Sequence, residues 1–149
     1  MQTFDLDLNK RYTYADYLSW WDDTRRELYN GFIRLMSPAP KRAHQKISAN
    51  ILIIIGQYLK NKQCEVYTAP FDVRIPKGEE KQDDKIYTVV QPDLTVICDP
   101  QKLDEKGCIG APDMVIEITS PKSASRDAKD KFLIYQNAGV KEYWLARPE

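Results

Sequence analysis

The stretch that decides the fold is Asp113-Met114-Val115-Ile116-Glu117-Ile118-Thr119-Ser120, an apolar and β-prone run with one acid inside it. Side chains alternate along a strand, so Glu117 shares a face with Val115 and Thr119. An ionised carboxylate inside a sheet costs several kcal/mol unless a cation offsets its charge. The run therefore predicts a buried strand whose acid faces a metal ion or a basic partner.

A second strand of the same kind precedes it, Gln91-Pro92-Asp93-Leu94-Thr95-Val96-Ile97, again with an acid at one end. Neighbouring strands lie about 4.8 Å apart, so Asp93 and Glu117 approach one another if their strands are adjacent. Asp113 cannot share an ion with Glu117, because extended chain separates the two by about 13 Å. Asp93 and Glu117 are therefore the pair that geometry favours for one divalent cation.

Composition limits the class of protein. The 149 residues suit one domain, and 22 basic against 22 acidic side chains give no support to a non-specific nucleic-acid coat, although basic residues can still gather in one cleft. The cysteines Cys64, Cys98 and Cys108 form no C-x-x-C pair and are odd in number, so we expect them reduced. No signal peptide is visible and the longest aliphatic run, Ile51–Ile55, is too short for a bilayer. These features predict a cytoplasmic protein with no membrane partner.

Several chemistries are excluded by missing motifs. The sequence contains no G-x-x-x-x-G-K-[ST], no G-x-G-x-x-G and no G-x-S-x-G, which removes the common nucleotide-binding loops and the serine-hydrolase elbow. One histidine and scattered cysteines supply too few ligands for a structural zinc site.

The first half of the chain predicts a helix, a hairpin and a long helix. Thr13 to Asp16 resembles a capping box that opens a short helix to about Trp21. Asn30-Gly31 lies between two strand-like runs and predicts a type I′ hairpin. A long helix is expected over residues 41–60. Its predicted buried stripe is Ala43, Ile47, Ile51, Ile54, Ile55 and Tyr58.

The second half alternates strands with one helix. We expect an edge or bulged strand over 64–75, a charged loop over 76–85, strands over 88–98 and 113–119, a helix capped by Ser125 and stopped by Gly139, and a last strand over 140–146. The order predicts an α/β fold, a mixed sheet flanked by helices, with one parallel crossover near the end.

Six motifs spread over nearly the whole chain carry a resemblance to a known family. They are Glu27-Leu28-Tyr29-Asn30-Gly31; Ser37-Pro38 with His44; Gln91-Pro92-Asp93; Gly110 to Pro121; Ser125-Arg126-Asp127 with Lys131 and Tyr135; and Gly139 to Trp144. As a set they closely resemble the Uma2 family, also called DUF820. That family belongs to the PD-(D/E)xK, or restriction-endonuclease-like, superfamily.

The resemblance implies a single restriction-endonuclease-like domain over residues 1–149 with a metal-dependent nuclease core. Asp93 matches the first acid of the signature and Glu117 the second, and both are expected to hold Mg²⁺ or Mn²⁺. Thr119 stands where the superfamily has a lysine, and in this family the lysine is expected on the following helix, at Lys131.

Two further residues are candidates for supporting roles. Glu27 is a candidate extra metal ligand, and its alternative is a surface ion pair beside Arg25 and Arg26. His44 is a candidate phosphate contact or general acid/base, with no role as the alternative. The family usually continues beyond Tyr143 with further sheet, so one interpretation of an end at Glu149 is a shortened member with an open sheet edge.

Three functions follow as hypotheses. The first is a Mg²⁺-dependent endonuclease acting on DNA, as a homodimer by analogy with relatives. The second is a catalytically weak or inactive nucleic-acid-binding or regulatory module of the same fold, and the third is a partner-binding domain of a larger assembly. Structural alternatives also remain open for the site itself: Asp93 as a turn former, Glu117 in an ion pair, and Lys131 as a solvated lysine beside Asp127. For Asp113 a structural role is expected.

Overall fold

A computed structural model describes residues 4–36, 39–119 and 126–148 of the chain. The Ser37-Pro38 motif and the Ser125 helix cap lie outside the described residues. The elements are α1 (Tyr14–Tyr17), β1 (Arg26–Tyr29), β2 (Phe32–Leu35), α2 (Arg42–Leu59), β3 (Glu65–Thr68), β4 (Asp72–Ile75), η1 (Asp83–Lys85), β5 (Thr88–Val90), β6 (Leu94–Ile97), η2 (Pro100–Lys102), β7 (Leu103–Asp104), β8 (Gly107–Ile109), β9 (Met114–Ile118), α3 (Arg126–Ala138) and β10 (Glu142–Ala146).

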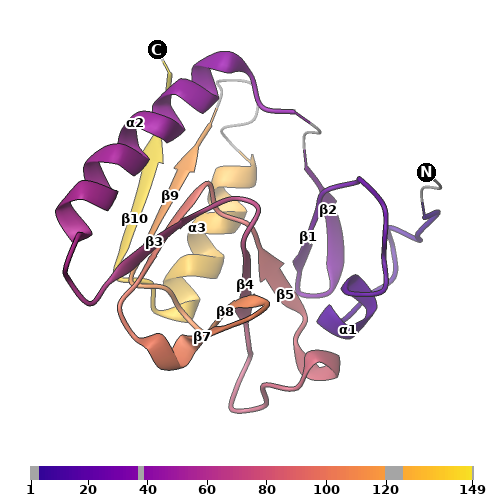
Figure 1. The fold of residues 1–149 in the computed structure, drawn as a ribbon. Helices are drawn as coiled ribbons and strands as arrows, with labels where there is room; N and C mark the ends of the chain where they lie inside the picture. The colour runs from indigo at the N-terminus through magenta and orange to yellow at the C-terminus, as the bar shows by residue number, and fades with distance from the viewer. Residues whose placement is uncertain (1–3, 37–38, 120–125, 149) are drawn as a thin grey trace.

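The described strands form two sheets, of order β2-β1-β5-β4-β8-β7 and β10-β9-β6-β3. Figure 1 shows the second sheet between α2 on one side and α3 on the other. β6 pairs antiparallel with β9, whereas β9 and β10, which flank α3 in the sequence, are parallel. The predicted α/β class with mixed pairing is therefore confirmed, with the strands divided between two sheets.

The predicted hairpin and first cap are both present. Asn30 and Gly31 have φ angles of 51° and 90°, and Tyr29 pairs with Phe32 across them. Positive φ at both central positions is what a two-residue hairpin turn requires. Thr13 and Asp16 form the expected capping box, although α1 ends at Tyr17, earlier than predicted.

The predicted stripe of α2 is wrong in part, because Ala43, Ile54 and Tyr58 are exposed. The half-buried face consists of His44, Ile47, Ser48, Ile51, Leu52, Ile55, Gly56 and Leu59. Five consecutive apolar residues from Ile51 to Ile55 are compatible with several helical stripes, so only packing against the sheet selects one of them.

α3 packs on the opposite face of the second sheet. Tyr135 is 1% exposed and belongs to a buried cluster with Val115 of β9, against which Tyr143 of β10 also packs. Alternation then directs Glu117, two residues after Val115, toward α3 as well. Within the described residues no helix has the length and apolar character to cross a bilayer.

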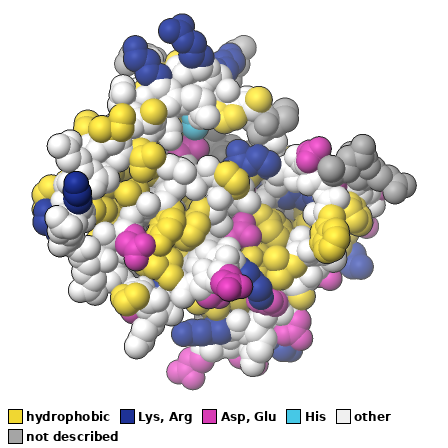
Figure 2. Space-filling view, viewed as in Figure 1, with side chains coloured by type: hydrophobic (Ala, Val, Ile, Leu, Met, Phe, Trp, Pro, Cys, Tyr) yellow, Lys and Arg dark blue, Asp and Glu magenta, His cyan; other side chains and the backbone are white. Residues whose placement is uncertain are grey.

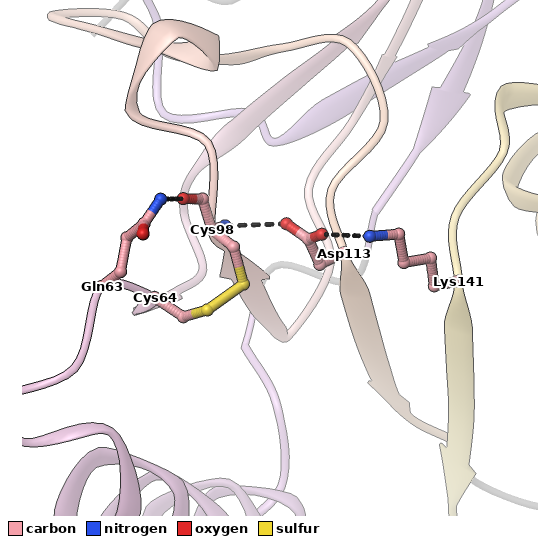
Figure 3. The surroundings of a disulfide bond; sticks show 5 residues. All are labelled: Gln63, Cys64, Cys98, Asp113 and Lys141. Carbon is pink, nitrogen blue, oxygen red and sulfur yellow. Dashed lines mark hydrogen bonds and ion pairs between the residues drawn. A yellow bond between two sulfur atoms is a disulfide. The ribbon is translucent and has the colours of Figure 1, made fainter.

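The prediction that all three cysteines are reduced is wrong. Cys64 and Cys98 form a disulfide, and Figure 3 shows it beside Asp113. Glu65 and Ile97 are strand partners, so the two cysteines face each other one position further along the antiparallel pair. The Cys98 amide donates to Asp113 Oδ2 at 2.7 Å, which gives Asp113 the structural role expected for it. Cys108 is free and buried.

Candidate metal and active site

Asp93 and Glu117 meet where β6 and β9 begin to separate. Leu94 and Ile116 are the last residues that pair directly between the two strands. Beyond them, the carboxylates of the two acids accept the backbone hydrogen bonds. The Asp93 amide donates to Glu117 Oε1 at 3.0 Å, and the Ile118 amide donates to Asp93 Oδ2 at 2.7 Å. The two acids that sequence geometry selected are therefore brought together, each carboxylate fixed by the other strand's backbone.

Lys131 of α3 points into this acidic site. The residue is 6% exposed, and its ammonium group donates to Glu117 Oε2 and lies 3.3 Å from Glu27 Oε2. The alternative of a solvated helix lysine is therefore wrong. A turn later on the same helix, Tyr135 is buried beside the same acids.

Glu27 of β1 is a third acid of the site. It is 3% exposed; its Oε2 accepts the Gln91 amide at 2.7 Å and its Oε1 accepts the Tyr29 hydroxyl at 3.3 Å. The alternative of a surface ion pair is wrong, because Arg26 pairs instead with Asp22.

His44 reaches the site from the opposite side of the sheet. It lies in the first turn of α2, and its Nε2 is 3.1 Å from Asp93 Oδ1, while Nδ1 lies 2.9 Å from Gln45 Oε1. The two helices thus supply one basic side chain each: α2 brings His44 to Asp93, and α3 brings Lys131 to Glu117. In Figure 2 histidine, acidic and basic side chains lie close together in the upper part of the face.

The electrostatics leave an excess of negative charge. Burial raises the pKa of Glu117 from 4.5 to about 7; Lys131 opposes this rise, and the charges of Glu27 and Asp93 add to it. For Lys131, burial acts to lower the pKa, but Glu117 and Glu27 outweigh it and hold the pKa well above its usual value. The lysine stays protonated, and its one ammonium group faces two carboxylates, Glu27 and Glu117, while Asp93 lies beside His44.

The donor set fits a hard divalent cation. Mg²⁺ prefers carboxylate oxygens and keeps several waters, so two protein ligands, Asp93 and Glu117, suffice. In the described part of the chain no group of three Asp, Glu, His or Cys side chains is arranged around one point, so waters would complete the coordination. The Tyr135 hydroxyl is buried, and in the described structure it has no hydrogen-bond partner; such a donor suits a site that takes up an oxygen-rich group.

Sequence reasoning missed Arg25 and Gln91. The Arg25 Nη2 donates to Gln91 Oε1 at 3.0 Å, while the Arg25 Nε is buried without a partner among the described residues. No carboxylate in the described ranges forms an ion pair with this guanidinium. The one sequence signal for Arg25 is its position: it lies two residues before Glu27 and therefore on the same face of an extended chain.

Known proteins resemble this chain over most of its length. "Uncharacterized protein slr1290" of Synechocystis sp. (strain ATCC 27184 / PCC 6803 / Kazusa) is 28% identical over 133 residues, which are 87% of this chain and 65% of that protein. The chain thus spans about 65% of the length of this curated relative.

A solved structure and a family profile match as well. The 1.96 Å crystal structure of a "putative nuclease belonging to DUF820" from Anabaena variabilis ATCC 29413 aligns with a TM-score of 0.70 at 21% identity, over 91% of this chain and 74% of that one, which confirms the fold. The profile of Uma2, described as "Putative restriction endonuclease", matches residues 14–149. The chain belongs to the Uma2 family.

Proposed function

We propose that this protein is a Mg²⁺- or Mn²⁺-dependent endonuclease that hydrolyses phosphodiester bonds in DNA. One observation carries the proposal: Glu27 and Glu117 share one buried lysine, and Asp93 is held against Glu117 through its amide, so three acids gather around a single ammonium group and a histidine. A divalent cation would offset the negative charge of these acids, and phosphodiester hydrolysis is a reaction that such a cation promotes. Membership of a family described as restriction endonucleases supports the same reaction class. A cytoplasmic location remains a prediction.

Asp93 and Glu117 would hold the cation, and their amide hydrogen bonds fix both carboxylates in advance. The bound ion would supply a water of lowered pKa and polarise the scissile phosphate. Lys131, protonated throughout the neutral range, would donate hydrogen bonds to the attacking water or to the phosphoryl oxygens as charge develops. A permanently protonated lysine cannot act as a general base. His44 would hold the Oδ1 atom of Asp93 in place through its Nε2.

Arg25 is the residue that we assign to the substrate phosphate. Its guanidinium is anchored through one nitrogen on Gln91, and this half-buried side chain keeps further N–H donors that a phosphate oxygen would satisfy. Arg34 is a weaker candidate, because its guanidinium already bridges to Asp130 at 2.7 Å.

The test uses supercoiled plasmid with Mg²⁺ and three variants. Asp93→Asn and Glu117→Gln should abolish nicking, whereas Asp113→Asn should retain it. Asp113 follows a proline as Asp93 does, but it binds the Cys98 amide instead of the site. Equal nicking by all four proteins, or none by pure folded wild type, would remove the proposal.

The second candidate is a nucleic-acid-binding module of the same fold without activity. It is favoured by the direct contact of Lys131 with Glu117, which already gives that acid a cation. DNA binding in EDTA that weakens with salt and survives Glu117→Gln, together with no cleavage by wild type, would select it.

A homodimer is also proposed, through β10, which is an edge strand of the second sheet among the described residues. On that strand Trp144 and Leu145 are 51% and 41% exposed. An open edge with apolar side chains favours pairing with another strand. Sedimentation of wild type and Trp144→Glu would test it: the variant should be monomeric, and a wild-type monomer at all concentrations would contradict it.

A further inference from the structure

A cleft of about 470 Å³ adjoins the candidate metal site. Residues that line the cleft are bonded, directly or through the next residue, to acids of the metal site. Gln91 lines the cleft with its side chain while its amide donates to Glu27, and Pro70 lines it while the amide of Ala69 donates to the Asp93 carbonyl at 3.1 Å. Only one or two residues therefore separate the cleft from the metal site, so that one ligand can occupy both.

Aromatic rings form the walls of this cleft. Tyr67 and Phe71 stack in parallel, with ring centroids 4.6 Å apart and planes 4° apart, and Tyr17 lines another part. All three rings are half-buried, so each keeps some accessible surface. In Figure 2 hydrophobic and acidic side chains lie next to each other near the middle of this face. Aromatic surfaces of this kind hold nucleobases by stacking, whatever the sequence.

Tyr17 and Gln91 have used the donors of their side chains, whereas Lys106 has used one of its three. The Tyr17 hydroxyl donates to Asp72 Oδ1 at 2.9 Å, and Gln91 Nε2 donates to the Tyr17 hydroxyl at 2.7 Å and to Asp72 Oδ1 at 2.9 Å. Burial, and then Asp72, raise the pKa of Tyr17, so its proton stays in place. One Lys106 ammonium hydrogen goes to Asp83.

Acceptors remain available. Among the described residues Asp72 Oδ2 accepts one hydrogen bond, from the Tyr14 hydroxyl, and each carboxylate oxygen can accept two. Glu105 adds negative charge to the lining, whereas Asp104 is paired with Arg74. A phosphate is repelled from such a cleft, whereas a flat, neutral ring that carries N–H groups satisfies it.

We propose that the cleft holds an unpaired nucleobase with an exocyclic amino group, adenine, cytosine or guanine, while the adjoining phosphodiester lies at Asp93 and Glu117. The inference rests on the proposed function and narrows its substrate. In a duplex the amino group is paired and both faces of the base are stacked, so only a single-stranded or flipped base can enter. The substrate class is therefore DNA with an unpaired adenine, cytosine or guanine next to the cleaved bond.

Nucleosides test the cleft apart from catalysis, because they carry no phosphate. We would titrate adenosine, cytidine, guanosine, uridine, thymidine and the guanidinium compound agmatine into the protein in EDTA, with chemical-shift changes as the readout. The three nucleosides with an amino group should bind about tenfold more tightly than uridine or thymidine. Phe71→Leu should weaken their binding about tenfold, and Phe132→Leu, which shortens a half-exposed ring on α3, should not change it. A melting curve for each variant checks the fold.

Each outcome decides one point. Nucleoside binding by wild type and Glu117→Gln alike, without cleavage of any DNA, would uphold the cleft and refute the nuclease. Cleavage of DNA without nucleoside binding would refute the cleft alone. Equal binding of all five nucleosides, or binding of agmatine only, would also overturn the proposal, the latter in favour of a cationic ligand.

Discussion

Lys131 of α3 forms a buried ion pair with Glu117 of β9. Thr119 occupies the position, two residues after the acid, where the superfamily has its lysine, and the helix supplies the ammonium group from the side instead. The same ammonium lies 3.3 Å from Glu27, so one cation serves two acids. The site thus holds an ammonium group between two acids, and the role of Lys131 in place of the signature lysine remains a prediction.

Removal of this lysine should destabilise the protein. In Lys131→Met two buried carboxylates lose their cation, and breaking a buried pair in this way costs about 3–5 kcal/mol of the free energy of unfolding. Urea denaturation in EDTA should show that loss, and millimolar Mg²⁺ should restore part of it. Lys129→Met, on the exposed side of α3, is the control and should change little. A stable Lys131→Met protein that ignores Mg²⁺ would contradict the arrangement.

Glu117 should make stability fall as pH rises. Its pKa is 4.5 when exposed and about 7 in the folded protein, so folding favours the protonated form. That contribution is complete below pH 4.5 and is lost as pH rises through 7, with a total on the order of 1–3 kcal/mol. Glu117→Gln, which keeps an acceptor for the Asp93 amide, should lack this decline.

The measurement is urea unfolding of both proteins in EDTA at pH 5 and pH 8. The variant should gain stability relative to wild type at the higher pH. If the difference between the two proteins is the same at both pH values, Glu117 does not titrate in this range and the excess of negative charge is absent.

Arg25 should act on substrate binding more than on the chemical step. Arg25→Gln removes the donor that we assign to a phosphate oxygen, so the KM for DNA should rise about tenfold while kcat changes little. Lys81→Gln removes one charge from an exposed loop and should leave both constants unchanged. A fall in kcat alone, or an equal effect of both variants, would show that Arg25 does not hold the substrate.

The disulfide gives a count of reactive thiols. Under denaturing, non-reducing conditions one thiol, Cys108, should react with a maleimide, and two more should react after reduction. Cys64→Ser should lower the free energy of unfolding by about 3–4 kcal/mol, as expected for a loop of this length. Three reactive thiols before reduction would show that the strands come together without the bond.

Local patterns predicted the parts of the site that depend on one strand or one turn. The alternation along β9 and the Pro-Asp start of β6 were enough to pair Glu117 with Asp93, and Asn30-Gly31 was enough to place the hairpin that carries Glu27. The hydrogen bond from the Gln91 amide to Glu27 depends on the register of β1 against β5. No local sequence pattern predicts that register. Long-range register is set by packing, so neither Arg25 nor the disulfide was predictable.

Isothermal titration calorimetry with Mn²⁺ and Mg²⁺ tests the central claim most directly. Wild type and Asp113→Asn should each bind one ion with the same affinity, and Asp93→Asn and Glu117→Gln should bind none under the same conditions. If folded wild-type protein takes up neither metal, or the two site variants bind it as wild type does, Asp93 and Glu117 do not form a metal site.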